Sequence, residues 1–132
     1  EVTKFDCSLG ESKKMATELK ATNTEIERVT GKRPIFFRPP YGVTNPTLSK
    51  AIEANKMISI GWSLRSFDTI HDKNKVMKKL MKRTKPGVVI LFHDNDVKIL
   101  GIVEEYLQWL KQKHFKIVSL ESLFKIDAYE AV

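Results

Sequence analysis

The run Val88-Val89-Ile90-Leu91-Phe92-His93-Asp94 places an unbroken apolar stretch directly before a histidine and an aspartate. A strand with one solvated face alternates apolar and polar residues, and this run does not alternate. We therefore expect a strand that is covered on both faces, as in a parallel sheet flanked by helices. The run predicts an α/β fold with His93 at the carboxyl end of a buried strand.

Helical and strand patterns alternate on both sides of this run. Apolar residues recur at helical spacing over 12–30 and 99–110. Asn45-Pro46 and Asp72 are typical helix starts, because Asn and Asp cap free amides and Pro is tolerated in the first turn. Further strand patterns occupy 35–37, 57–61 and 115–118. The order predicts parallel strands that are joined by right-handed crossovers.

The size and composition of the chain favour one domain over residues 1–132. A chain of 132 residues, 42% of them hydrophobic, is long enough for one compact core. The helix pattern comes before any strand pattern, so a barrel built from these units is expected to be incomplete. Exposed strand edges would then allow pairing with a second copy, and a homo-oligomer is expected.

Charge and cysteine content exclude several classes of protein. The net charge of +7 favours anionic partners, but many lysines, as over 73–85, lie at the spacing of a solvated helix face. No groove-reading motif accompanies the charge, so nucleic acid is not an expected partner. No apolar run approaches the roughly 20 residues of a membrane-spanning helix. The lone Cys7 excludes an intramolecular disulfide and a cysteine-based zinc site.

Three expected strands end in residues that are able to take part in catalysis. Arg38 follows the first strand, the stretch 62–68 follows the second, and His93-Asp94 follows the third. The carboxyl ends of parallel strands share one face of the fold, so we expect these residues to converge there.

Asp68 and His93 form the candidate acid. A carboxylate that holds one imidazole nitrogen favours the protonated ring and prepares it as a general acid. A histidine at a strand end is about as often a structural residue. Asp94 would instead cap the following helix.

Arg38-Pro39-Pro40-Tyr41-Gly42 predicts a rigid turn after the first strand. Fixed backbone amides that face a developing oxyanion contribute roughly 3 to 4 kcal/mol in acyl transfer. Arg38 alternatively serves only to tie the loop down.

The chain resembles the later motifs of the NodB-homology polysaccharide deacetylases, carbohydrate esterase family four. The resemblance covers essentially the whole chain, and three motifs at strand ends carry it. They are Phe37-Arg38-Pro39-Pro40-Tyr41-Gly42, Gly61-Trp62-Ser63-Leu64-Arg65-Ser66-Phe67-Asp68-Thr69 and Ile90-Leu91-Phe92-His93-Asp94.

The resemblance implies a distorted (β/α) barrel, here partial, with parallel strands and outer helices. It also implies removal of acetyl groups from sugars with a divalent metal, commonly zinc. Arg38 would orient the catalytic base, and the amide of Tyr41 would bind the oxyanion. Leu91 would line the pocket for the acetate methyl group. His93 would protonate the leaving group and Asp68 would tune it.

The sequence departs from the family in its metal ligands. Neither Thr-Phe-Asp-Asp-Gly nor His-x-x-x-His occurs, and His71, His93 and His114 lack that spacing. No metal ligand is therefore assigned, and no metal is expected to bind this chain. In the family the histidine pair precedes a stretch similar to Phe5-Asp6, so the chain is expected to begin just downstream of it.

A second departure concerns the wall that faces the substrate. Relatives often carry Asp-x-x-Asp-Trp where this chain has Arg65-Ser66-Phe67-Asp68-Thr69. Trp62 would supply an aromatic surface for the sugar from another position. Alternatively, Trp62 packs in the core beside Phe37 and Phe92.

These observations lead to two hypotheses about function. The first is a metal-dependent carbohydrate deacetylase that acts on an acetylated polysaccharide or a peptidoglycan glycan, of which this chain is an incomplete and inactive part. The alternative is a non-catalytic carbohydrate-binding or interaction module of the same fold. The resemblance suggests a secreted or cell-envelope protein.

Overall fold

The computed structural model describes residues 12–69, 71–94 and 96–130 and contains two compact units. The first unit comprises Glu1–Gly61 with Leu120–Val132, and the second comprises Trp62–Ser119. A single domain over the whole chain stays a prediction. The proposals made for Phe5-Asp6 and Cys7 lie outside the described residues.

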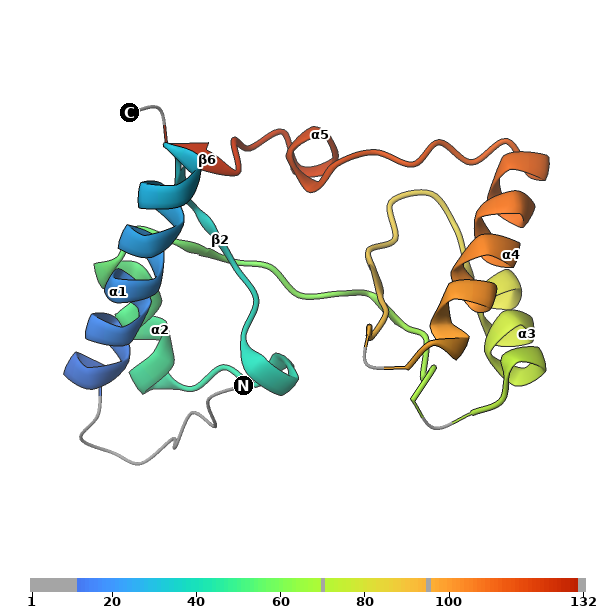
Figure 1. Ribbon diagram of the computed structural model, residues 1–132, viewed down its shortest axis with the longest axis horizontal. Coiled ribbons are helices and arrows are strands. Elements are labelled where there is room, and N and C mark those ends of the chain that lie inside the picture. Colours follow the sequence, from blue (N-terminus) through green and yellow to red (C-terminus); the bar gives the residue numbers. More distant parts are fainter. Residues whose placement is uncertain (1–11, 70, 95, 131–132) are drawn as a thin grey trace. The chain divides into compact units, whose positions relative to one another are not determined.

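Two packed helices form the core of the first unit (Figure 1). Helix α1 spans Ser12–Thr30 and α2 spans Pro46–Ala54, as the periodicity and the Asn45-Pro46 start predict. The Asn45 side chain accepts a hydrogen bond from the Leu48 amide at 2.8 Å, which satisfies one free donor of the first turn. Their contact is apolar and comprises Met15, Leu19, Leu48, Ala51 and Ile52.

The strands of the first unit are short and pair in both directions. Strand β2 (Phe36–Phe37) runs parallel to β3 (Ile58–Ser59), as expected. Strand β1 (Arg33–Pro34) instead pairs antiparallel with β6 (Tyr129–Glu130), so the expectation of only parallel strands is wrong here. The periodicity of single strands does not show which distant strand will pair with them, and β6 is almost 100 residues away along the chain.

Two short helical segments complete the first unit. A 3₁₀ turn, η1, spans Pro40–Gly42 in the Pro-Pro-Tyr-Gly loop, and helix α5 spans Leu120–Phe124. The Glu121 side chain accepts a hydrogen bond from the Ala128 amide at 2.8 Å, which fixes the chain between α5 and β6.

The second unit pairs two strands and packs two helices. Strand β4 (Leu64–Arg65) is parallel to β5 (Ile90–Leu91), with Arg65 opposite Leu91. Helix α3 spans Lys73–Arg83, and the Asp72 side chain caps it by accepting from the Lys75 amide at 3.0 Å. Helix α4 spans Lys98–Gln112. Both helices occur where the sequence predicts them.

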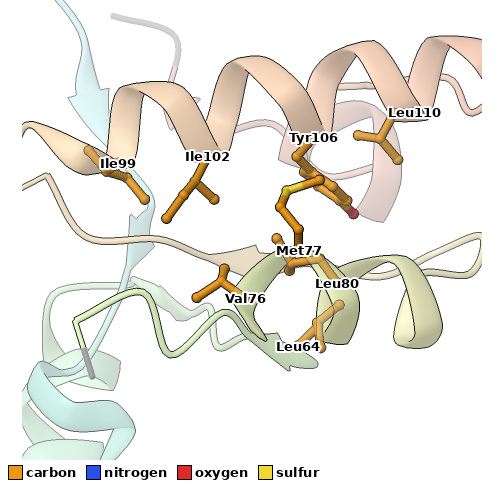
Figure 2. Close-up of a cluster of buried hydrophobic side chains, with 8 residues drawn as sticks. All are labelled: Leu64, Val76, Met77, Leu80, Ile99, Ile102, Tyr106 and Leu110. Atoms are coloured by element: carbon orange, nitrogen blue, oxygen red, sulfur yellow. The ribbon is translucent and has the colours of Figure 1, made fainter. Parts of the chain in front are cut away.

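The core of the second unit lies between its two helices. Figure 2 shows that α4 directs side chains spaced three and four residues apart toward α3, and that Leu64 of β4 joins them. The buried members are Leu64, Val76, Met77, Leu80, Ile99, Ile102, Tyr106 and Leu110. The ring of Tyr106 stacks on Trp109 at 5.9 Å, and Trp109 stacks on Phe115 at 6.0 Å between ring centroids.

Two strand predictions in the second unit need correction. Residues 88–92 are half-buried rather than buried on both faces, because β5 pairs only with β4 among the described residues. Residues 115–118 form no strand, since no described segment pairs with them, and Ile117 and Val118 are exposed. In the described part of the chain, no helix is long and apolar enough to cross a membrane.

Candidate active site

A buried carboxylate holds the imidazole of His93 in the second unit. Asp68 is 3% exposed, and its Oδ1 atom lies 3.1 Å from His93 Nδ1. Its Oδ2 atom accepts a hydrogen bond from the His93 backbone amide at 3.0 Å. The hydroxyl of Ser66 donates to Oδ1. The carboxylate therefore fixes both the backbone and the ring of His93.

The parallel pairing of β4 and β5 brings these residues together. The register places Arg65 opposite Leu91. The segments that follow these two residues therefore start side by side and lead to Asp68 and His93. The Ser66 amide donates to the Leu91 carbonyl at 3.2 Å, which extends the pairing by one residue. Leu64, Ser66 and Asp68 are buried, while Arg65 and Thr69 are exposed.

The hydrogen bonds to Asp68 determine its charge. Burial is the largest single influence and opposes ionisation. Hydrogen bonds from Ser66, from the His93 ring and from the His93 amide together outweigh it, so the pKa of Asp68 lies below its usual value. Asp68 is therefore an acceptor at neutral pH, and His93 Nδ1 must carry the proton that the two groups share.

This arrangement leaves one ring nitrogen of His93 for chemistry. Because Nδ1 donates to Asp68, Nε2 is the atom that can exchange a proton with another molecule. The His93 side chain is 33% exposed, so a ligand can approach it. The site can thus deliver or accept a proton at a defined atom.

The other predicted residues of the second unit have separate positions. Leu91 lies in β5, two residues before His93, and is half-buried. Trp62 is also half-buried, whereas Asp94 is exposed. Asp94 does not cap α4, because the Lys98 amide at the start of that helix donates to the side chain of Asp96 at 3.0 Å.

Arg38 and Tyr41 belong to the first unit. The Arg38 guanidinium donates to the carbonyl oxygens of Ile60 and Gly61 at 3.4 and 3.3 Å, so it ties its loop to the segment after β3. Tyr41 is 85% exposed and has a φ of 56°, which orients the tight turn before Gly42. Convergence of this pair with Asp68 and His93 stays a prediction.

The described residues do not suit a divalent metal. Residues 12–69, 71–94 and 96–130 contain no group of three or more His, Cys, Asp or Glu side chains that could hold a metal ion. Zinc sites in proteins use at least three such ligands. Asp68 Oδ1 and His93 Nδ1 are already hydrogen-bonded to each other.

Ser66 is a residue of the candidate site that sequence reasoning missed. It is fully buried and donates to Asp68, so it sets the charge of the candidate acid's partner. Its position two residues before Asp68 was the only available signal in the sequence.

Comparison with known proteins shows which family the chain is similar to. The family model described as polysaccharide deacetylase matches residues 6–58. A peptidoglycan-N-acetylglucosamine deacetylase of Bacillus cereus is 31% identical over 125 residues, which cover 83% of this chain and 45% of the relative. The chain is thus similar to the polysaccharide deacetylase family.

Solved structures of this family share the fold of the chain. The peptidoglycan deacetylase PdaC from Bacillus subtilis is similar with a TM-score of 0.76 at 25% identity, covering 86% of this chain and 55% of that one. A family 4 carbohydrate esterase from Streptomyces lividans gives 0.71 at 26% identity, covering 93% and 62%. The fold is accordingly α/β, a part of the distorted (β/α) barrel of these polysaccharide deacetylases.

The chain is shorter than its relatives in the polysaccharide deacetylase family. It spans 45% of the Bacillus cereus relative and 12% of a bifunctional xylanase/xylan deacetylase from Cellvibrio japonicus, which is 32% identical over 77 residues, or 58% of this chain.

Proposed function

We propose that these residues are part of a carbohydrate deacetylase that hydrolyses an acetamide or an acetyl ester on a polysaccharide or a peptidoglycan-like glycan. The observation that carries the proposal is the buried Asp68 holding His93 Nδ1, with the other ring nitrogen left for proton transfer. The relatives named as peptidoglycan deacetylases support the substrate class.

The proposed role of His93 is to protonate the leaving group. In hydrolysis of an acetamide, the oxygen of water bonds to the carbonyl carbon, the C–N bond breaks, and the nitrogen must gain a proton to leave as an amine. His93 Nε2 would supply that proton, and Asp68 would keep the ring in the tautomer that allows it. General acid catalysis of this kind contributes about 10²- to 10⁴-fold to the rate.

The remaining site residues have proposed roles in binding. Leu91, two residues before His93 in the chain, would contact the acetyl methyl group, and Trp62 would face the sugar. The amide of Tyr41, fixed by its tight turn, would donate to the oxyanion, and Arg38 would orient the catalytic base.

The metal of the complete domain is proposed to be zinc, which would polarise the carbonyl and activate water. The donor set of the described residues does not fit this ion. The sequence also lacks His-x-x-x-His and Asp-Asp. We therefore expect this chain alone to release no acetate from a tetrasaccharide of N-acetylglucosamine, with or without added zinc. Metal-dependent release by the chain alone would contradict this expectation.

A non-catalytic carbohydrate-binding or interaction module of the same fold is the second candidate. The gene upstream of the codon for Glu1 separates the two. Asp-Asp and His-x-x-x-His motifs there support the enzyme, and their absence supports the binding module.

If those motifs are present, the protein they encode provides the test of the acid. His93→Gln is expected to lower kcat by about 10²-fold or more with little change in KM, because the group acts on the leaving nitrogen and not on binding. An unchanged kcat would overturn the proposed role.

A further inference from the structure

A cluster of positive charge surrounds one aromatic ring in the second unit. Lys79 Nζ lies 3.3 Å from the centroid of the Phe67 ring, and Arg65 Cζ lies 4.9 Å from it. Arg83 is close enough to contribute to the electrostatic environment of Lys79. We call Arg65, Phe67, Lys79 and Arg83 the Phe67 cation cluster. Two of its three cations, Arg65 and Lys79, lie over this half-buried ring.

These cations lack an acidic partner in the part of the chain that the structure describes. Other basic residues there form ion pairs, such as Lys73 with Glu105 at 2.7 Å and Lys98 with Asp96 at 3.3 Å. No described carboxylate lies within ion-pair distance of Arg65, Lys79 or Arg83. Like charges brought together without a counter-ion attract an anion from solution.

Lys79 is an exception to the solvated helix face that the sequence suggests for 73–85. Lys79 is half-buried, and burial is the first cause that lowers its pKa, followed by the charges of Arg83 and Arg65. Moving the Lys79 ammonium group out of water, beside two other cations, costs free energy unless another interaction offsets that cost. The face of an aromatic ring offsets part of this cost, and a bound anion would offset more.

The backbone holds the ring in place for this contact. Phe67 has a φ of 60°, which is uncommon for a bulky residue. It follows the buried Ser66 and precedes the buried Asp68, so one short segment supplies both the partner of His93 and the ring of the cluster. An extended chain covers at most about 3.6 Å per residue, so the Cα atoms of Arg65 and Asp68 are at most ~11 Å apart, within reach of a short saccharide.

We infer that Arg65, Lys79 and Phe67 form a binding site for an oxyanion carried by a saccharide. The Arg65 guanidinium presents a planar fork that suits a carboxylate or a phosphate, and Lys79 adds a compact charge beside it. The saccharide part of this inference rests on the proposed function. The site would make the protein prefer an acidic sugar over a neutral one.

Titration of the isotope-labelled 132-residue chain, followed by NMR at low ionic strength, tests the site. The probes are N-acetylglucosamine, N-acetylmuramic acid, N-acetylglucosamine phosphate and inorganic phosphate. The two acidic sugars are expected to bind about tenfold more tightly than the neutral one, the effect of one charge-assisted interaction. Amide shifts are expected at Arg65, Phe67 and Lys79.

The double variant Arg65→Gln, Lys79→Gln is expected to abolish this preference and to leave the weak binding of N-acetylglucosamine unchanged. The matched control, Lys78→Gln with Lys82→Gln, removes the same charge from exposed positions of α3 and is expected to change affinity less than about twofold. All these positions are exposed except Lys79, which is half-buried. Lys79→Met is therefore a second variant, because it removes the charge and keeps apolar contact with Phe67.

Several outcomes would overturn the inference. A preference that survives the double variant, or that falls equally in the matched control, excludes a defined site. Inorganic phosphate that binds as tightly as the sugar phosphate excludes a saccharide ligand, as does tighter binding of a single-stranded oligonucleotide. None of these outcomes involves acetate release. The proposed function is tested separately, by the kcat of His93→Gln, so the two failures can be distinguished.

Discussion

At the scale of single residues, the candidate site depends on one carboxylate that is buried and yet charged. Three donors compensate Asp68 for the loss of water, and two of them belong to the residue that it positions. Hydrogen bonds to a charged group contribute about 1.5 to 3 kcal/mol, more than bonds between neutral groups. The stability of the fold and the proposed function are therefore linked at this residue.

Acid is expected to weaken the fold through Asp68. Because its pKa is lower in the folded chain than in the unfolded chain, its contribution to the free energy of unfolding is fully present above the unfolded pKa, about 3.9. That contribution is lost as the pH falls through the lower pKa of the folded state. Urea unfolding of the wild type between about pH 6 and pH 2 is expected to show this loss.

Asp68→Asn is the variant that checks the acid effect. It is expected to lower the free energy of unfolding by about 1 to 3 kcal/mol at neutral pH and to flatten the acid dependence. The exposed Asp94→Asn serves as the control. Equal acid dependence in wild type and Asp68→Asn would show that other carboxylates cause it.

Ser66→Ala tests the donor that sequence reasoning missed. The change removes one of three donors to Asp68 and is expected to cost about 1 to 3 kcal/mol, with the acid transition moved to higher pH. Thr69→Ala, at an exposed position of the same segment, is expected to cost much less. The measurement is again urea unfolding as a function of pH.

At the scale of elements, local signals predicted the helices well and the strands less well. Asn45 and Asp72 are caps in the structure because capping depends only on the next three residues. Strand pairing depends on distant residues, so the antiparallel partner of Arg33–Pro34 was not predicted and 115–118 was assigned a strand wrongly.

The same distinction holds for the candidate site. The contact of Asp68 with His93 follows from parallel strands and could be expected from the motifs. Phe67 has a left-handed backbone and lies between cations. Both features depend on tertiary packing, so they could not be predicted from the residue types alone.

The cap of α2 gives a prediction at this scale. Asn45→Ala removes the acceptor for the Leu48 amide and is expected to lower the free energy of unfolding by about 1 kcal/mol. Asn45→Ser keeps an acceptor at this position and is expected to retain most of this free energy. Thermal unfolding of both variants, followed by circular dichroism, checks the expectation; an equal loss in both would argue against capping.

At the scale of the whole molecule, the two units raise the question of cooperative unfolding. Leu80 is fully buried in the core of the second unit, and Leu80→Ala is expected to cost about 2 to 5 kcal/mol. If the chain is one domain, hydrogen exchange will accelerate in both units. Acceleration confined to Trp62–Ser119 would show that the units unfold separately.

Strand edges lead to a prediction about assembly. Each described strand pairs with a single partner, so each of the three described ladders has free edges. Unpaired edges favour association with a second copy, and light scattering is expected to find a dimer. A monodisperse monomer over a wide range of concentrations would contradict this.

The stacked rings of Tyr106, Trp109 and Phe115 have a practical consequence for measuring the unfolding of this chain by fluorescence. Both tryptophans, Trp62 and Trp109, lie in Trp62–Ser119, so indole fluorescence reports on that part alone. The helices α1 and α2 are invisible to that probe. A melting curve from fluorescence that coincides with one from far-ultraviolet dichroism would then be direct evidence that the whole polypeptide melts in one step.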